Sequence, residues 1–115
     1  MADLIPLLPY DSGAIRALAG DLRRRAAQLH DAGSELTGVG GALVFEGPAG
    51  DRVRDELKLC ARDAANGATR LQDAAGKLDS AAADVDSENA RIDAHNQQVL
   101  RDMSPMERRY VLENR

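Results

Sequence analysis

Apolar residues recur every seven positions along two long stretches of the chain. In the first stretch this column consists of Ile15, Leu22, Leu29, Leu36 and Leu43. A second column beside it consists of Leu18 or Ala19, Ala26, Ala32 and Val39, with Arg25 as an interruption. A seven-residue repeat of this kind is typical of a helix that packs along another helix. We therefore predict a first helix that begins at Asp11 or Ser12, both good N-cap residues, and weakens at the glycines at positions 38, 40 and 41.

The second stretch is longer and has the same periodicity. Its apolar column consists of Leu57, Ala64, Leu71, Leu78, Val85, Ile92 and Val99. A companion column consists of Val53, Cys60, Ala68 or Gly67, Ala75 or Ala74, and Ala82 or Ala81. This pattern predicts a second helix from about Ala49 to about Met103. Because Gly47-Pro48 breaks a helix and Pro48 suits the start of a new one, we place the turn near residues 45–48.

The end of the sequence predicts a short third helix within residues 104–115. Ser104 suits an N-cap, Pro105 suits the first helical position, and Glu107 completes a capping box. The helix should run from Pro105 to about Asn114. No C-cap glycine follows it, which is compatible with a further domain beyond the given sequence.

These elements predict an all-α fold. Residues 12–103 should form an antiparallel helical hairpin whose second helix is longer than the first. Residues 1–11 form an apolar arm that Pro6 and Pro9 keep out of helical conformation. A hairpin buries one stripe on each helix, so that a dimer forming a four-helix bundle would give a better core.

The extra length of the second helix leaves an overhang, at about residues 83–103, that extends roughly 30 Å beyond the first helix. Val85, Ile92 and Val99 lie on one face of this overhang and need cover. Three kinds of cover remain open. The arm, whose reach is roughly 36 Å, could run along the overhang, a partner's helix pair could cover it, or the chain could dimerise.

Composition and charge exclude several classes of function. Only 3% of the residues are aromatic, 30% are charged, and the formal net charge is -4. An acidic chain without a basic face is unsuited to a nucleic-acid partner. No apolar run is long enough to cross a membrane, and the first residues lack the basic region of a Sec signal peptide. We therefore expect no nucleic-acid partner and no stable membrane insertion.

The sequence predicts no catalytic residue, no cofactor and no metal site. His30 and His95 fall on different helices, whereas zinc needs three or four closely spaced ligands. The acidic residues at positions 84, 86, 88 and 93 fit a solvated helix face, because the glycine-bearing loop of a calcium site is missing. Cys60, the single cysteine, falls in the companion column, and we expect it to be a small buried hydrophobe. We expect a binding protein and not an enzyme.

The turn carries an aromatic-x-Gly tripeptide, formed by Phe45, Glu46 and Gly47. In a short Ala-rich hairpin, this tripeptide resembles the Trp-x-Gly turn of the WXG family of small type VII secretion substrates. The resemblance covers roughly residues 12–103, with Phe45 in the place of Trp. The family's export signal, Tyr-x-x-x-Asp/Glu, is absent in strict form, because the acid after Tyr110 is Glu113, at the third following position and not the fourth.

The resemblance implies that two hairpins pair as an antiparallel four-helix bundle, with a second copy of the chain or another small helical protein as the partner. It also implies export to the cell envelope or the medium by a type VII route, with a secretion ATPase as a further partner. The residues that we expect at the partner interface are Leu57, Leu71, Leu78, Val85, Ile92 and Val99. Tyr110 and Glu113 form the candidate export element. The alternative is a structural coiled-coil dimerisation module of the cytoplasm, without an export role.

Overall fold

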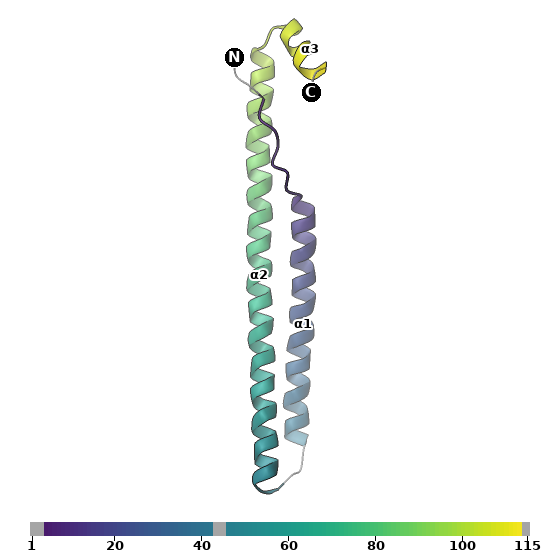
Figure 1. The fold of residues 1–115 in the computed structure, drawn as a ribbon, viewed down its shortest axis with the longest axis vertical. Helices are drawn as coiled ribbons and strands as arrows, with labels where there is room; N and C mark the ends of the chain where they lie inside the picture. The colour runs from purple at the N-terminus through teal and green to yellow at the C-terminus, as the bar shows by residue number, and fades with distance from the viewer. Residues whose placement is uncertain (1–3, 43–45, 114–115) are drawn as a thin grey trace.

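The computed structural model describes residues 4–42 and 46–113. Within these ranges the chain forms three α-helices and no strand: α1 (Ser12–Ala42), α2 (Gly47–Asp102) and α3 (Pro105–Glu113). α1 and α2 lie side by side as an antiparallel pair, in a rod of 88 × 17 × 15 Å (Figure 1). The predicted all-α class and the hairpin with a longer second helix are confirmed.

Side-chain caps begin α1 and α3. The Asp11 carboxylate accepts a hydrogen bond from the Ala14 N–H at 3.2 Å, which satisfies one of the free donors of the first turn. At α3 the Ser104 N–H donates to the Glu107 carboxylate at 3.3 Å, and the Glu107 N–H donates to the Ser104 hydroxyl at 3.2 Å. This reciprocal pair is the capping box that the sequence predicts.

The turn between the long helices is described from Glu46 onward. Glu46 is extended, and Gly47 has a φ of +85°, a left-handed conformation that glycine adopts without steric cost. Pro48 occupies the first turn of α2, where its missing N–H costs nothing. The helix therefore begins two residues before the predicted start. Leu43 and Phe45 lie outside the described residues.

α1 and α2 meet through small residues spaced seven positions apart, here called the small-residue seam. It consists of Ala19, Ala26 and Gly33 on α1, which are buried, and of Ala61, Ala68, Ala75 and Ala82 on α2, of which Ala61 is half-buried and the others are buried. Among the described residues, no large side chain is fully buried. A Cβ added at Gly33 would lie 3.2 Å from the Ala61 carbonyl oxygen and 3.4 Å from the Ala64 Cβ. The two helix backbones therefore approach closely, as small residues permit.

Both predicted companion columns contain positions that lie one residue away from the seam. On α1, Ala32 and Val39 are exposed, whereas Gly33 is buried. On α2, Cys60 is exposed and Ala61 takes its place, so that the prediction of a buried thiol is wrong. A strict seven-residue repeat through the buried alanines passes through Gly33 and Ala61. A neighbouring residue is rotated by about 100° around the helix axis and faces solvent.

The arm, described for residues 4–10, runs along the overhang of α2 (Figure 1). α2 has 56 residues and α1 has 31, so that α2 is longer by roughly 38 Å at 1.5 Å per residue. This extra length is divided between the arm end and the turn end of the rod (Figure 1). Of the three kinds of cover that the sequence leaves open, the structure contains the first. α3 follows the end of the overhang, at the opposite end of the rod from the turn.

Candidate partner-binding surface

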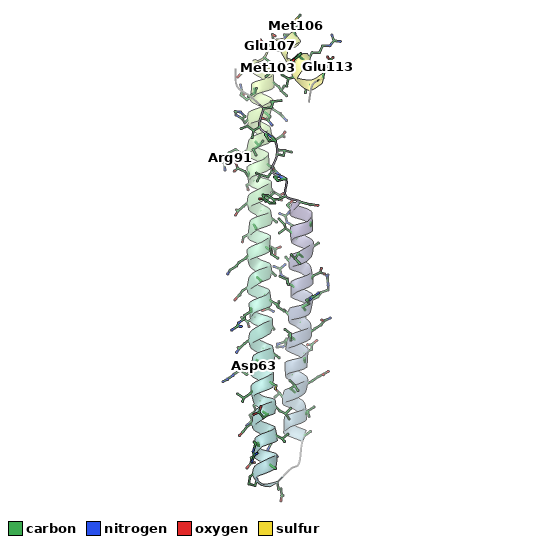
Figure 2. All side chains as sticks on the ribbon, viewed as in Figure 1. Asp63, Arg91, Met103, Met106, Glu107 and Glu113 are labelled. Atoms are coloured by element: carbon green, nitrogen blue, oxygen red, sulfur yellow. The ribbon has the colours of Figure 1, made fainter. Side chains whose placement is uncertain are left out.

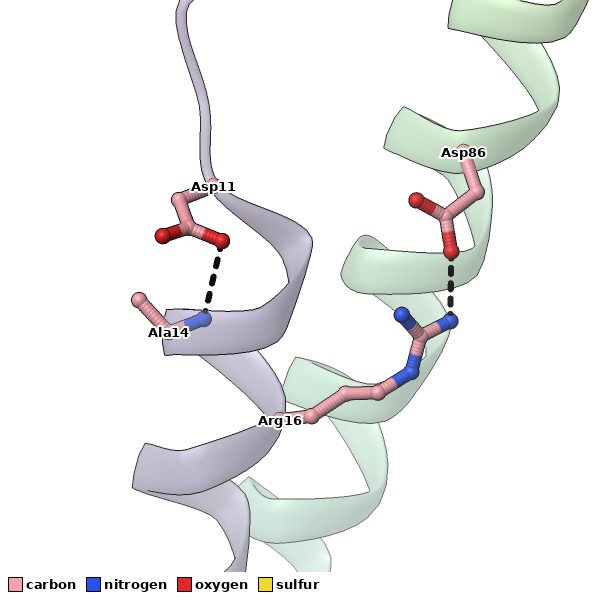
Figure 3. A network of polar contacts seen from close by, with 4 residues as sticks. All are labelled: Asp11, Ala14, Arg16 and Asp86. Atoms are coloured by element: carbon pink, nitrogen blue, oxygen red, sulfur yellow. Dashed lines mark hydrogen bonds and ion pairs between the residues drawn. The ribbon is translucent and has the colours of Figure 1, made fainter.

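One face of the hairpin carries two ion pairs between described residues of α1 and α2. Arg16 pairs with Asp86 at 2.8 Å (Figure 3), and Arg23 pairs with Asp79 at 2.5 Å. The partners are seven residues apart on each helix, so that the contact repeats along the rod. All four side chains are about half exposed, and pairs of this kind contribute little to stability. The two ion pairs instead fix the register of α1 against α2, because a shift of one helix along the other would break both pairs.

Asp86 also helps to hold the start of α1. Hydrogen bonds from Ser12 and then from Arg16 lower the pKa of the Asp86 carboxyl, and the Arg16 charge acts in the same direction, while desolvation opposes the shift. Ser12 is the first residue of α1. Arg16, one turn later, reaches Asp86 from the same helix (Figure 3). The ionised carboxylate therefore joins the overhang to the beginning of the first helix.

The opposite face of the hairpin carries the larger apolar side chains, and we call it the apolar face. Each of these residues comes three positions after a position in the seven-residue spacing of the small-residue seam, which places it about 60° from the seam around the helix axis. Each ion-pairing residue comes four positions after such a position, which places it about 40° from the seam in the opposite direction. Because the helices are antiparallel, equal offsets bring the two columns to the same side. The columns are Ile15, Leu22, Leu29 and Leu36 on α1 and Leu57, Ala64, Leu71, Leu78 and Val85 on α2, all half-buried in the single chain.

The flanks of the apolar face are more exposed than its centre. Leu18 and Val39 on α1 are 51% and 50% exposed, and Val53 on α2 is 43% exposed. Leu18 lies near the arm, whereas Val39 and Val53 lie near the turn. Leu59 is similarly exposed, at 44%, but its position two residues before Ala61 turns it about 160° away from the seam. Apolar surface therefore extends to both ends of one face of the hairpin.

Two asparagine side chains bind the arm to the overhang. Asn96 accepts a hydrogen bond from the Ile5 N–H at 2.8 Å and donates one to the Ile5 carbonyl at 2.7 Å. Asn89 accepts a hydrogen bond from the Leu8 N–H at 2.8 Å. An extended segment cannot pair its own main-chain groups, so that these amides provide the partners that it lacks. Asn96 is only 5% exposed, and buried amides require such hydrogen bonds.

Asn89 and Asn96 continue the seven-residue spacing of Ala75 and Ala82. The column changes from alanine to asparagine at the level where α1 begins, beyond which the arm is the neighbour of α2. The sequence analysis missed both asparagines. The sequence does mark their positions, because two polar amides replace alanine in a regular column, but the column alone does not indicate what the amides bind.

The predicted interface residues divide into two groups. Leu57, Leu71, Leu78 and Val85 lie on the apolar face. Ile92 and Val99 are only 8% and 7% exposed, in the part of α2 along which the arm runs. A partner could reach these two residues only if the arm moved. Binding of a partner to any of the six stays a prediction.

The predicted turn motif and export element lie at opposite ends of the rod. Phe45 lies outside the described residues, and the Glu46 side chain is exposed and does not cap α2. Tyr110 is 68% exposed on α3, where Glu113 forms an ion pair within the helix. Met106 and Glu113 mark this end of the molecule in Figure 2. A single chain does not bring the two elements together.

The remaining candidate groups lie on the surface. His30, His95 and Cys60 are all exposed. Within residues 4–42 and 46–113, no three His, Cys, Asp or Glu side chains are grouped so that they could hold a metal ion. In the same ranges, no helix has the length and apolar character that crossing a membrane requires. Side chains project into solvent along the whole rod, including Asp63 and Arg91 on the outer side of α2 (Figure 2).

Comparisons with protein-family models, with curated proteins and with solved structures found no match.

Proposed function

We propose that the protein is a non-catalytic interaction module that pairs with a second helical hairpin through its apolar face. The observation that carries this proposal is the accessible surface of 8489 Å², because a compact chain of this mass would expose about 6,100 Å². The radius of gyration is 26.4 Å, compared with about 13 Å for a compact domain of this length. Part of the excess surface is apolar, and its burial stabilises an assembly by about 25 cal/mol per Å².

A second hairpin is the partner that this surface fits best. Two hairpins that join their apolar faces bury the large side chains of all four long helices, as a four-helix bundle does. An antiparallel arrangement would bring Leu18 of one protomer, near the arm, to Val39 and Val53 of the other, near the turn. Two-fold symmetry would repeat the same contact at the other end. A second copy of the chain, or a small protein with the same kind of face, meets these requirements.

Charge placed on the apolar face tests this pairing. Leu18 and Val53 are exposed enough for Leu18→Glu and Val53→Glu to cost the single chain little, but an unpaired carboxylate in an interface is strongly unfavourable. Leu59→Glu is the matched control, because Leu59 is equally exposed on the outer side of α2. Light scattering should show that the double variant dissociates at concentrations at which the wild type and the control remain paired. Equal masses for all three proteins would contradict the proposed interface.

We also propose that the module follows a type VII export route, with the secretion ATPase as a second partner. The support is the resemblance of the turn, the left-handed Gly47 that the turn requires, and the exposure of Tyr110 on a separate short helix. Secretion of the full chain should be compared in a bacterium with a type VII system and in the same strain without the ATPase. Tyr110→Ala should reduce export. Retention in both strains would favour the cytoplasmic dimerisation module.

A further inference from the structure

The arm contains a three-residue repeat that matches the seven-residue repeat of the overhang. Ile5-Pro6-Leu7 and Leu8-Pro9-Tyr10 both read aliphatic-Pro-apolar. The first residue of each triplet donates its main-chain N–H to an asparagine of α2, and the proline that follows has no N–H to satisfy. Three residues of polyproline-like chain span about 9.3 Å and seven residues of helix about 10.5 Å, so that successive triplets meet successive asparagines.

The hydrogen bonds that hold the arm on α2 all involve its main chain. Asn96 uses both halves of its amide on the N–H and C=O of one residue, Ile5. The side chains of Ile5, Leu7 and Tyr10 are 44%, 54% and 63% exposed. Those of the two remaining aliphatic residues, Leu4 and Leu8, are half-buried. Main-chain hydrogen bonds provide affinity for any segment of the right conformation, whereas side-chain pockets would restrict its sequence. The overhang therefore selects an extended backbone with the aliphatic-Pro-apolar spacing.

We propose that the overhang of α2 is a receptor for extended aliphatic-Pro-apolar segments, and that residues 4–10 are its resident occupant. A segment of this chemistry on a partner protein replaces the arm. The arm is connected covalently to the hairpin only through Asp11, and it takes no part in the small-residue seam between α1 and α2. Replacement of the arm by another segment therefore leaves the hairpin folded. Ile92 and Val99, on the part of α2 along which the arm runs, are only 8% and 7% exposed.

The binding experiment uses the full chain and a fluorescent peptide, Leu-Ile-Pro-Leu-Leu-Pro-Tyr, which has the sequence of residues 4–10. In the wild type the attached arm competes at an effective concentration of about 1 mM. Ile5→Pro removes the N–H that Asn96 accepts and loosens the attached arm. Fluorescence anisotropy should show that this variant binds the peptide at least about fivefold more tightly than the wild type.

Two further changes in the Ile5→Pro background test the asparagine itself. Asn96→Asp keeps the side chain's size and one acceptor, but it replaces the amide donor by an oxygen that faces a peptide carbonyl. It should weaken peptide binding at least about tenfold. Gln97→Glu adds the same charge at an exposed neighbouring position and should leave binding unchanged. Circular dichroism checks that the variants keep their helices, and light scattering checks that pairing through the apolar face is unaffected.

A second peptide, N-acetylated Val-Pro-Ile-Ile-Pro-Phe, keeps the spacing and both amide donors with different side chains, and should bind within about tenfold of the first. A peptide with prolines at the two donor positions should not bind. The receptor is overturned if the Ile5→Pro variant shows no saturable binding up to about 1 mM, or if Asn96→Asp binds equally well. If the arm sequence binds and the second peptide does not, the occupant is the arm of another copy of this chain. That result would overturn the proposal that a segment of a different protein replaces the arm.

Discussion

Gly33 provides the sharpest test of how α1 and α2 are held together. A Cβ at this position would lie 3.2 Å from the Ala61 carbonyl oxygen and 3.4 Å from the Ala64 Cβ. Gly38, on the same helix, has no such neighbour within 4 Å of an added Cβ. The same substitution at the two glycines therefore separates helix propensity from packing between the helices.

The expected free energies follow from these distances. Alanine is about 1 kcal/mol more favourable than glycine within a helix, so that Gly38→Ala should raise the free energy of unfolding by up to that amount. At Gly33 the tight contacts offset this gain, and we expect no net stabilisation. Leucine adds further carbon atoms where the backbones touch. Gly33→Leu should therefore lower the free energy of unfolding by roughly 2–3 kcal/mol, whereas Gly38→Leu should be neutral or slightly stabilising.

Urea unfolding, followed by far-UV circular dichroism, measures these differences. All proteins must be compared at one concentration, because association raises the apparent stability. The informative comparison is Gly33→Leu with Gly38→Leu, since both introduce the same side chain into α1. Equal free energies of unfolding for these two variants would refute the close approach of the helices at the small-residue seam.

Two further predictions concern the ends of α1 and α3. Because its folded pKa is lowered, Asp86 contributes stability above the ordinary aspartate pKa, and this contribution is lost as the pH falls through the folded value. Asp86→Asn should therefore flatten the fall of Tm below about pH 4, and an unchanged acid limb in thermal unfolding would count against the contacts with Ser12 and Arg16. Ser104→Ala removes the acceptor of the Glu107 N–H and should destabilise α3 locally by about 1 kcal/mol. Hydrogen exchange should then accelerate in α3 without a change in Tm, and unchanged protection would contradict the role of the cap.

Periodicity was sufficient to predict the hairpin, because leucine and isoleucine at seven-residue spacing distinguish a helix face without ambiguity. It was insufficient for the small-residue seam. Ala, Gly and Cys are all small enough for a close contact between helices, and neighbouring alternatives such as Ala74 and Ala75 are identical in the sequence. The displacement of Cys60 from the seam is the consequence. Only the strict spacing from a buried alanine identifies Ala61.

The arm and its receptor depend on contacts between distant parts of the chain. Asn96 and Ile5 are 91 positions apart. The buried amide of Asn96 and the extended main chain at Ile5 are each accounted for only by their hydrogen bonds to one another. Asn89 and Asn96 interrupt an apolar column, and a local pattern gives no reason for them until the extended neighbour is known. The ion pairs of Arg16 and Arg23 likewise require the register of the two helices. The sequence could show that the overhang needs cover, but not which cover it has.

The most direct test of the proposed function is the absolute mass of the full chain in solution. Light scattering behind a sizing column at micromolar concentration should give 24.6 kDa, twice the 12.3 kDa of one chain. The Leu18→Glu and Val53→Glu double variant should give 12.3 kDa under the same conditions, while Leu59→Glu should remain paired. A wild-type mass of 12.3 kDa at every concentration would contradict the pairing of two copies through the apolar face.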